Sequence, residues 1–217
     1  MSGSANGRFV IFGSERGRRQ DIYRKPWDGS GPEERLTESD HTQYPRSASP
    51  DGKSVAFVQD GDIWLLALDG SGKTTPLFTT PFVEDAPAFS PDGKYIAYQT
   101  NESGRDEINI VPYPVRGGKW QVSSGGGTNP IWSPSGSELY FTKGDAIYSV
   151  AIHAGSGFDY SAPVKVLTLP ADGAFITGVS KDNKQFALVT IPVTELSTSE
   201  FTLVTNWFQE LRNAFVK

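Results

Sequence analysis

Residues 88–98 read Ala88-Phe89-Ser90-Pro91-Asp92-Gly93-Lys94-Tyr95-Ile96-Ala97-Tyr98, two short apolar runs separated by a polar turn. Proline presets the first backbone angle of such a turn, aspartate can hydrogen-bond the backbone that follows it, and glycine accepts a positive φ. The stretch therefore predicts a tight turn with a strand on each side.

The same turn recurs along the chain at intervals of 41 to 47 residues. Its copies lie at 49–53, 90–94 and 133–137, with weaker copies at 4–8 and 180–184. In the last copy Asn183 stands where glycine stands in the others, and asparagine is the next most tolerant residue of a positive φ. The repeat therefore varies in a way that the backbone accepts.

Each repeat contains short β-prone segments, and the apolar run after each turn is expected to be a strand buried on both faces. These runs are Phe9–Phe12, Val55–Val58, Tyr95–Tyr98, Leu139–Phe141 and Phe186–Val189. Four strands in a period of about 43 residues are typical of a β-propeller blade, whereas a helical solenoid needs amphipathic helices of about 10–15 residues. No such helix is indicated before residue 206. The sequence therefore predicts an all-β propeller of about five four-stranded blades.

The turn and its flanking strands resemble the repeat of TolB-like, WD40-like bacterial β-propellers, and residues 88–98 match that repeat at nearly every position. The resemblance extends over about residues 4–206. Such blades serve as periplasmic interaction proteins, as propeller domains of serine peptidases and as sensor regions of bacterial protein kinases. The resemblance therefore implies the fold and a periplasmic or other extracytoplasmic location. It assigns no activity, because one fold hosts many functions, and the chain itself identifies no compartment.

The first and last blades are expected to be incomplete. In the strand order of the family the innermost strand precedes the turn, and the first blade begins at its turn, so we expect that strand to be missing. The last blade has segments 175–179, 186–189 and 201–204, and is expected to lack its outermost strand. We therefore expect the C-terminal part of a longer propeller, or a chain that completes its ring by self-association, since unpaired edge strands invite pairing.

Residues 206–217 depart from the repeat. Trp207, Leu211 and Phe215 have helical spacing, and Asn206 followed by Gln209 resembles a capping box. We expect a propeller domain over 1–205 and a short amphipathic α-helix over 206–217, which packs on the last blade or docks onto another domain.

The composition argues against several classes of protein. The chain has 20 Lys and Arg against 25 Asp and Glu, a net charge of −5, which is not the basic footprint of a nucleic-acid binder. The absence of cysteine excludes disulfides, thiolate metal sites and a cysteine nucleophile. No apolar run approaches the roughly 18 residues of a membrane helix, and the first seven residues do not resemble a signal peptide. We expect no nucleic-acid partner, no membrane insertion and no cofactor.

The candidate binding residues lie in loops on one face of the expected propeller. Counting from the innermost strand of a blade, the loops between the second and third strands share this face with the loops that join blades. We call it the loop face; the repeated turns lie on the opposite face. Binding concentrates in loops held by a rigid scaffold. The candidates are Arg16, Arg18, Arg19, His41, Glu84, Asp85 and Arg105.

The basic loop 13–20 can bind a carboxylate or phosphate through its arginines, or its charges can pair with neighbours such as Asp21. The loop 101–107 offers oxygen ligands for Ca²⁺ but lacks the spacing of an EF-hand, so we expect no metal there. Glu84 and Asp85 are expected to point apart, as neighbours in an extended chain do.

Two histidines, His41 and His153, limit the catalytic possibilities. A hydrolytic triad needs a base held by an acid and next to a nucleophile, and no Gly-x-Ser-x-Gly motif is present. We therefore expect a non-catalytic module that binds a protein or peptide within a larger bacterial signalling, transport or peptidase system. A hydrolase or lyase acting through carboxylates on the loop face is the second hypothesis. An element that completes a propeller ring by oligomerisation is the third.

Overall fold

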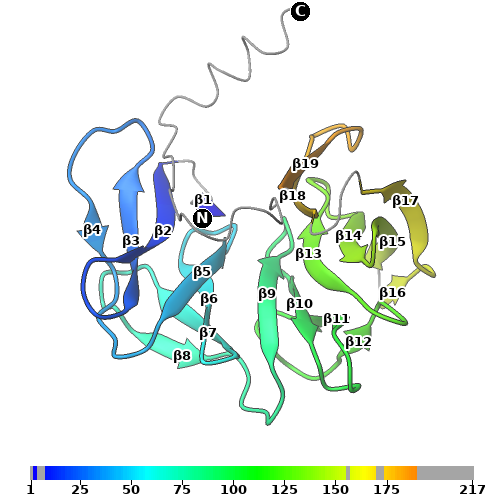
Figure 1. The fold of residues 1–217 in the computed structure, drawn as a ribbon, viewed down its shortest axis with the longest axis horizontal. Coiled ribbons are helices and arrows are strands. Elements are labelled where there is room, and N and C mark those ends of the chain that lie inside the picture. Colours follow the sequence, from blue (N-terminus) through cyan, green and yellow to red (C-terminus); the bar gives the residue numbers. More distant parts are fainter. Residues whose placement is uncertain (1, 4–7, 155–156, 170–173, 190–217) are drawn as a thin grey trace, which may run out of the picture.

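The computed structural model of the chain describes residues 2–3, 8–154, 157–169 and 174–189. These residues contain 19 strands in five antiparallel sheets, which follow one another along an arc from β1–β4 to β18–β19 (Figure 1). The all-β propeller of five blades is therefore confirmed. The helix expected over 206–217 and the strand expected over 201–204 lie outside the described residues. Within the described part, no helix is long and apolar enough to cross a membrane.

The strands of each sheet follow the order of the chain, except that β17 pairs with β15, so neighbouring strands form hairpins. The first blade contains β1 (Ser2–Gly3), β2 (Phe9–Glu15), β3 (Gln20–Pro26) and β4 (Glu34–Arg35). The second contains β5 (Gln43–Ala48), β6 (Ser54–Gln59), β7 (Asp62–Ala67) and β8 (Thr74–Pro76). The third contains β9 (Glu84–Phe89), β10 (Tyr95–Thr100), β11 (Glu107–Pro112) and β12 (Trp120–Gln121). The fourth contains β13 (Thr128–Trp132), β14 (Glu138–Lys143), β15 (Ala146–Ala154), β16 (Phe158–Tyr160) and β17 (Val164–Thr168). The fifth contains β18 (Phe175–Val179) and β19 (Phe186–Val189).

The strand that precedes each turn is the innermost strand of its blade. Contacts between successive blades join β1 to β5, β5 to β9, β9 to β13 and β13 to β18. Figure 1 shows these strands on the inner side of the arc, with β4, β8 and β12 on its outer side. The expected strand order is therefore confirmed.

The first and fourth blades differ from the expectation. The innermost strand of the first blade was expected to be missing, but Ser2–Gly3 pair with Val10 and Ile11 of β2, so the strand is short rather than absent. In the fourth blade, the long strand β15 pairs with β17 near its start and with β16 near its end. Strand β16 has no counterpart among the strands predicted from the sequence.

In the four turns that lie within the described residues, the serine that opens the turn also closes it. The Ser49 hydroxyl donates a hydrogen bond to Asp51 Oδ1 (2.7 Å) and accepts one from the amide of Ser54 (3.0 Å). Gly52 has a positive φ of 71°, and Asn183 has a φ of 58° at the equivalent position in the last turn. The prediction that asparagine replaces glycine at a positive φ is therefore confirmed.

Successive turns lie against one another on their face of the propeller. A Cβ atom at Gly93 would lie 3.6 Å from Cδ of Pro50, and one at Gly136 would lie 3.5 Å from Cδ of Pro91. The proline of one turn therefore packs beside the glycine of the next turn, one blade further along the chain.

The apolar core lies between the sheets. Four clusters join consecutive blades, and each contains fully buried side chains from the facing sheets. Representative pairs are Ile22 with Phe57, Ala56 with Ile96, Ile108 with Phe141, and Tyr140 with Ile176. Each blade therefore stabilises its neighbour by removing apolar surface from water.

Candidate functional site

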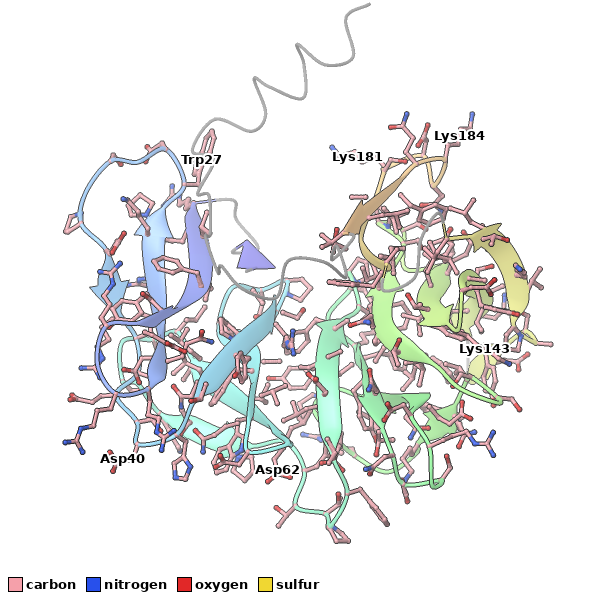
Figure 2. All side chains as sticks on the ribbon, in the orientation of Figure 1. Trp27, Asp40, Asp62, Lys143, Lys181 and Lys184 are labelled. Carbon is pink, nitrogen blue, oxygen red and sulfur yellow. The ribbon has the colours of Figure 1, made fainter. Side chains whose placement is uncertain are left out.

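The loop face and the turn face lie at opposite ends of the strands, because each sheet is antiparallel and its strands follow chain order. In Figure 2 the loop residue Asp40 and Asp62, the first residue of β7, lie at the lower edge of the molecule, while Lys181 and Lys184 of the last turn lie at the upper edge. The candidates from the sequence can be located on this framework.

The basic loop 13–20 does not form a cluster of arginines around one point. Arg16 forms an ion pair with Glu33, and its guanidinium lies 4.9 Å from the centre of the Tyr23 ring. Arg18 and Arg19 are exposed. Of the two alternatives for this loop, Arg16 follows the pairing with a neighbouring carboxylate, but its partner is Glu33 and not Asp21, which is bound by Arg35 at 2.6 Å. Arg35 follows on β4, and the sequence gives no local sign of this pairing.

His41 is paired with a carboxylate at the surface. Its Nδ1 lies 2.5 Å from Oδ2 of Asp60, and both side chains are more than half exposed. A histidine and an acid are thus adjacent. The backbone amide of His41 donates to the Ser39 hydroxyl (3.0 Å), but among the described residues no hydrogen bond joins the imidazole to a hydroxyl group.

Glu84 and Asp85 point apart, as expected. Glu84 is 3% exposed and accepts a hydrogen bond from the Thr80 hydroxyl, while its Oε2 atom has no partner among the described residues. Burial raises the pKa of its carboxyl group. Asp85 instead forms an ion pair with Arg46 at 3.0 Å. The two carboxylates therefore do not face a common point.

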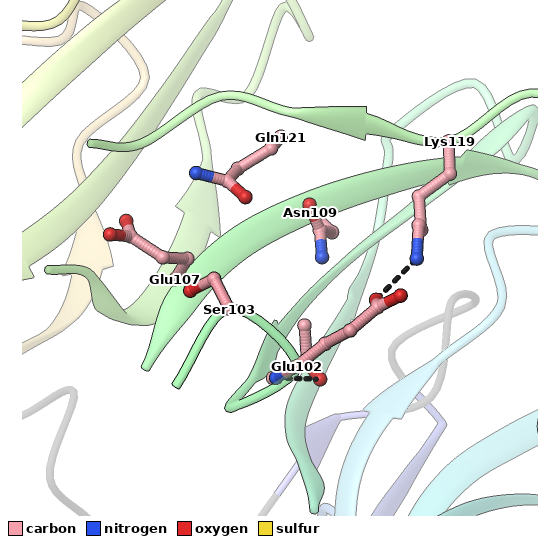
Figure 3. A pocket seen from close by; sticks show the side chains of 7 residues that line it. Glu102, Ser103, Glu107, Asn109, Lys119 and Gln121 are labelled. Atoms are coloured by element: carbon pink, nitrogen blue, oxygen red, sulfur yellow. Dashed lines mark hydrogen bonds and ion pairs between the residues drawn. The ribbon is translucent and has the colours of Figure 1, made fainter. Parts of the chain in front are cut away.

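A polar pocket of about 320 Å³ lies on the third blade, near the loop-face ends of β10 and β11. We call it the blade-three pocket. Its lining residues are Thr100, Glu102, Ser103, Glu107, Asn109, Lys119 and Gln121 (Figure 3). Lys119 and Glu102 form an ion pair, and their side chains are 44% and 42% exposed. Of the loops that the sequence singled out as candidate binding sites, only the loop 101–107 contributes residues to this pocket. Arg105 belongs to that loop, but its side chain is exposed and does not line the pocket.

The carboxylate of Glu107 fixes one side of the pocket. Its two oxygens accept hydrogen bonds from the Ser123 hydroxyl and from the amide of Gly126 (2.9 Å). A Cβ atom at Gly127 would lie 2.9 Å from Ile108 Cγ1, so glycine allows this loop to pack closely on β11. The glycine run 125–127 therefore holds a structural carboxylate.

Asn109 is the most buried polar group of the pocket that lacks a full set of partners. It is 3% exposed, and its Oδ1 atom has no hydrogen-bond partner within the described part of the chain. Figure 3 places its side chain between those of Lys119 and Gln121. The sequence offered one signal that we did not use: the equivalent positions of the other blades are aromatic, at Tyr23, Trp64 and Tyr148.

An apolar rim borders the pocket loop. Phe82 and Val83 are 37% and 50% exposed. The amide of Val83 donates to Asn101 Oδ1 (3.0 Å), and the amide of Asn101 donates to the Val83 carbonyl (3.2 Å). Asn101 directly precedes Glu102, so the rim and the pocket are joined by hydrogen bonds. Among the described residues, no group of three or more His, Asp or Glu side chains is arranged to hold a metal ion.

Comparisons with solved structures show the fold. The putative TolB from Agrobacterium tumefaciens is 22% identical with a TM-score of 0.59, and the match covers 75% of this chain and 64% of that one. TolB from Acinetobacter baumannii is 16% identical with a TM-score of 0.63, covering 86% and 52%. An oligogalacturonate lyase in complex with manganese is 17% identical with a TM-score of 0.56, covering 81% and 53%.

The chain therefore has the fold of a TolB-like β-propeller and spans between about half and two thirds of the length of these structures. No protein-family model matches the sequence, and no curated protein matches it.

Proposed function

We propose that this TolB-like propeller is a non-catalytic module that binds a segment of a protein or peptide on its loop face. The observation that carries the proposal is the exposed pair Phe82–Val83 beside the blade-three pocket. Protein-binding surfaces commonly combine apolar anchor residues with polar surroundings. Here Phe82–Val83 would be the anchor, and the blade-three pocket provides the polar surroundings.

The rim is held in place before a partner arrives. Val83 is hydrogen-bonded to Asn101 through both its amide and its carbonyl group, and the amide of Glu84 donates to the Gly61 carbonyl (2.8 Å). A preorganised loop loses less conformational freedom on binding, so more of the contact energy contributes to affinity.

A lyase or hydrolase acting through carboxylates is the second candidate, because an oligogalacturonate lyase shares the fold. We rank it below binding because its candidate groups do not converge. Glu84 is buried, Asp85 is paired with Arg46, and His41 is paired with Asp60. Glycosidase chemistry needs two carboxylates on opposite sides of one bond.

The wider setting is also a proposal. The resemblance to TolB-like proteins supports an extracytoplasmic location and a role within a larger bacterial signalling, transport or peptidase system. Completion of a propeller ring by oligomerisation is a third possible role.

Random peptides displayed on phage and selected on the purified chain test the binding function. We expect peptides whose affinity falls by about tenfold in the variants Phe82→Ser and Val83→Ser, since truncating an anchor costs about 1.4 kcal/mol or more. Fluorescence anisotropy with the selected peptides measures the change.

The matched control is Val164→Ser, because Val164 is 60% exposed on β17, outside the loop face. Peptides that bind all three variants as tightly as the unmodified chain would contradict the proposed site. Turnover of oligogalacturonate by the chain would favour the catalytic alternative.

A further inference from the structure

The blade-three pocket is surrounded by more negative than positive charge. Glu102 and Glu107 line it, and Lys119 is its one cation among the lining residues that the structure describes. Glu107 is held by Ser123 and Gly126, so Glu102 is the carboxylate available at the surface. Its present partner is an ammonium group of the same chain.

A third carboxylate lies beside the pocket. Glu84 on β9 is directly opposite Thr100 on β10, a lining residue. Burial raises the pKa of Glu84 against the effect of the Thr80 hydroxyl, and the charges of Asp62 and Glu102 raise it further. Burial and the charges of Glu84 and Glu102 likewise raise the pKa of Tyr98. The negative charges of Glu84, Glu102 and Asp62 thus act on one another beside the pocket, and this mutual repulsion favours a positive charge placed among them.

The pocket also contains an unused acceptor. Asn109 Oδ1 is buried and has no hydrogen-bond partner within the described ranges, although such groups are nearly always satisfied in folded proteins. A ligand that donates hydrogen bonds would satisfy it. An anionic ligand would instead meet the carboxylate of Glu102.

We propose that the blade-three pocket receives the arginine side chain of a bound peptide, whose guanidinium displaces Lys119 from Glu102. The guanidinium carries five donors in a planar fork, so it can bind the Glu102 carboxylate and donate to Asn109 Oδ1 at the same time. An ammonium is a point charge with a more strongly held hydration shell, which makes it the weaker ligand for two separate acceptors. This inference rests on the proposed function, because the arginine belongs to the partner on the loop face.

The test uses N-acetyl-arginine methylamide as the probe and N-acetyl-citrulline methylamide as its neutral isostere. Titration of the ¹⁵N-labelled chain, followed by NMR, is expected to shift the side-chain amide signals of Asn109 and Gln121 with the arginine probe. The citrulline probe is expected to leave them in place, because it lacks the charge.

Three variants separate the roles of the charges. Glu102→Gln is expected to weaken the arginine probe by about tenfold, as loss of a charge-assisted hydrogen bond does. Lys119→Ala removes the internal competitor, so we expect the affinity to rise by about two- to fivefold, the range of an exposed ion pair. Glu33→Gln changes an ion-paired glutamate of the first blade and is expected to have no effect.

An equal response to both probes, or a Lys119→Ala variant that binds arginine no better than the unmodified chain, would overturn the arginine pocket. The probe has no apolar part to occupy the rim at Phe82–Val83. Selected peptides that depend on Val83, together with an arginine probe that shifts no pocket signal, would therefore retain the proposed function and remove this inference alone.

Discussion

Asp51 lies in the turn between β5 and β6, where its carboxylate accepts two hydrogen bonds from within the turn. Oδ1 accepts hydrogen bonds from the Ser49 hydroxyl (2.7 Å) and from the amide of Lys53 (3.0 Å). The Ser49 hydroxyl lowers the pKa of Asp51, and the Lys53 amide lowers it further. In the fourth blade Ser135 stands at the equivalent position, and its hydroxyl lies 3.2 Å from that of Ser133.

We expect Asp51→Ala to lower the free energy of unfolding by about 1 kcal/mol, the usual net value of such hydrogen bonds. Asp51→Asn keeps the acceptor oxygen and loses the charge. Because the pKa is lower in the folded state, the carboxylate stabilises the fold fully above the unfolded-state pKa of about 3.9, and this contribution is lost as the pH falls through the folded-state value. The free energy of unfolding, measured with urea, should therefore fall less between neutral and acid pH for Asp51→Asn than for the unmodified chain.

The reciprocal variant is Ser135→Asp, which introduces the aspartate found in three other turns, at Asp51, Asp92 and Asp182. It is expected to be more stable than the unmodified chain at neutral pH and to lose that gain in acid. A Ser135→Asp variant whose stability falls at neutral pH would contradict this role of the turn carboxylate.

At single positions, the sequence predicted the turns better than the pocket. The chemistry of the turn is local: serine, aspartate and glycine act within a few residues, and Asn183 could be assigned its positive φ for that reason. The partners of Arg16 and Asp21 lie on separate strands, and no pattern in the basic loop identifies them. Asn109 was not predicted as a pocket residue, because it occupies a buried strand position, where β-strand patterns predict an apolar side chain.

The innermost strands are tied to one another by side chains that bind the backbone of the next blade. The Ser47 hydroxyl of β5 accepts a hydrogen bond from the amide of Phe89 in β9 (3.1 Å). The Trp132 indole of β13 donates to the Ala88 carbonyl of β9 (3.0 Å). These contacts connect elements about 42 to 44 residues apart, so they fix the position of one blade against the next.

Trp132→Phe is expected to lower the free energy of unfolding by about 1–3 kcal/mol, since it leaves the half-buried Ala88 carbonyl without the indole donor and reduces a buried ring. Trp27→Phe is the matched control, because Trp27 is 63% exposed. Its effect should stay within about 0.5 kcal/mol. Equal midpoints of urea unfolding for the two variants would contradict a structural role for the indole contact.

At the scale of the elements, the period of the sequence predicted the repeated strands, but it did not predict β16 or β1. Strand β16 is three residues long, and it is fixed by pairing with β15 and by the Tyr160 hydroxyl, which donates to the Gln121 carbonyl (3.0 Å). A segment held by contacts to a different blade has no repeat to identify it. Strand β1 was missed because its two residues are too few to show a strand pattern.

Across the whole molecule, stability comes from contacts between adjacent blades. The third blade has clusters with both the second and the fourth blade, whereas the described strands of the fifth blade pack on the fourth alone. In such a repeat array each unit is stabilised chiefly by its nearest neighbours.

We therefore expect the amides of β10 and β11 to exchange with deuterium more slowly than those of β18 and β19. Hydrogen exchange followed by mass spectrometry measures the difference in opening free energy. Ile108→Ala, at the junction of the third and fourth blades, should accelerate exchange in those two blades first. Uniform protection across all five sheets would indicate a single cooperative unit instead.

A core that lies between the sheets also determines what the growing chain exposes on the ribosome. A newly made blade has one apolar face that only the following blade can cover. At roughly 5–20 residues per second, a repeat of about 43 residues takes between about 2 and 9 seconds to synthesise. The apolar face of a new blade therefore stays exposed for several seconds. During translation, folding of this protein requires that this face be kept from aggregating until the next repeat is synthesised.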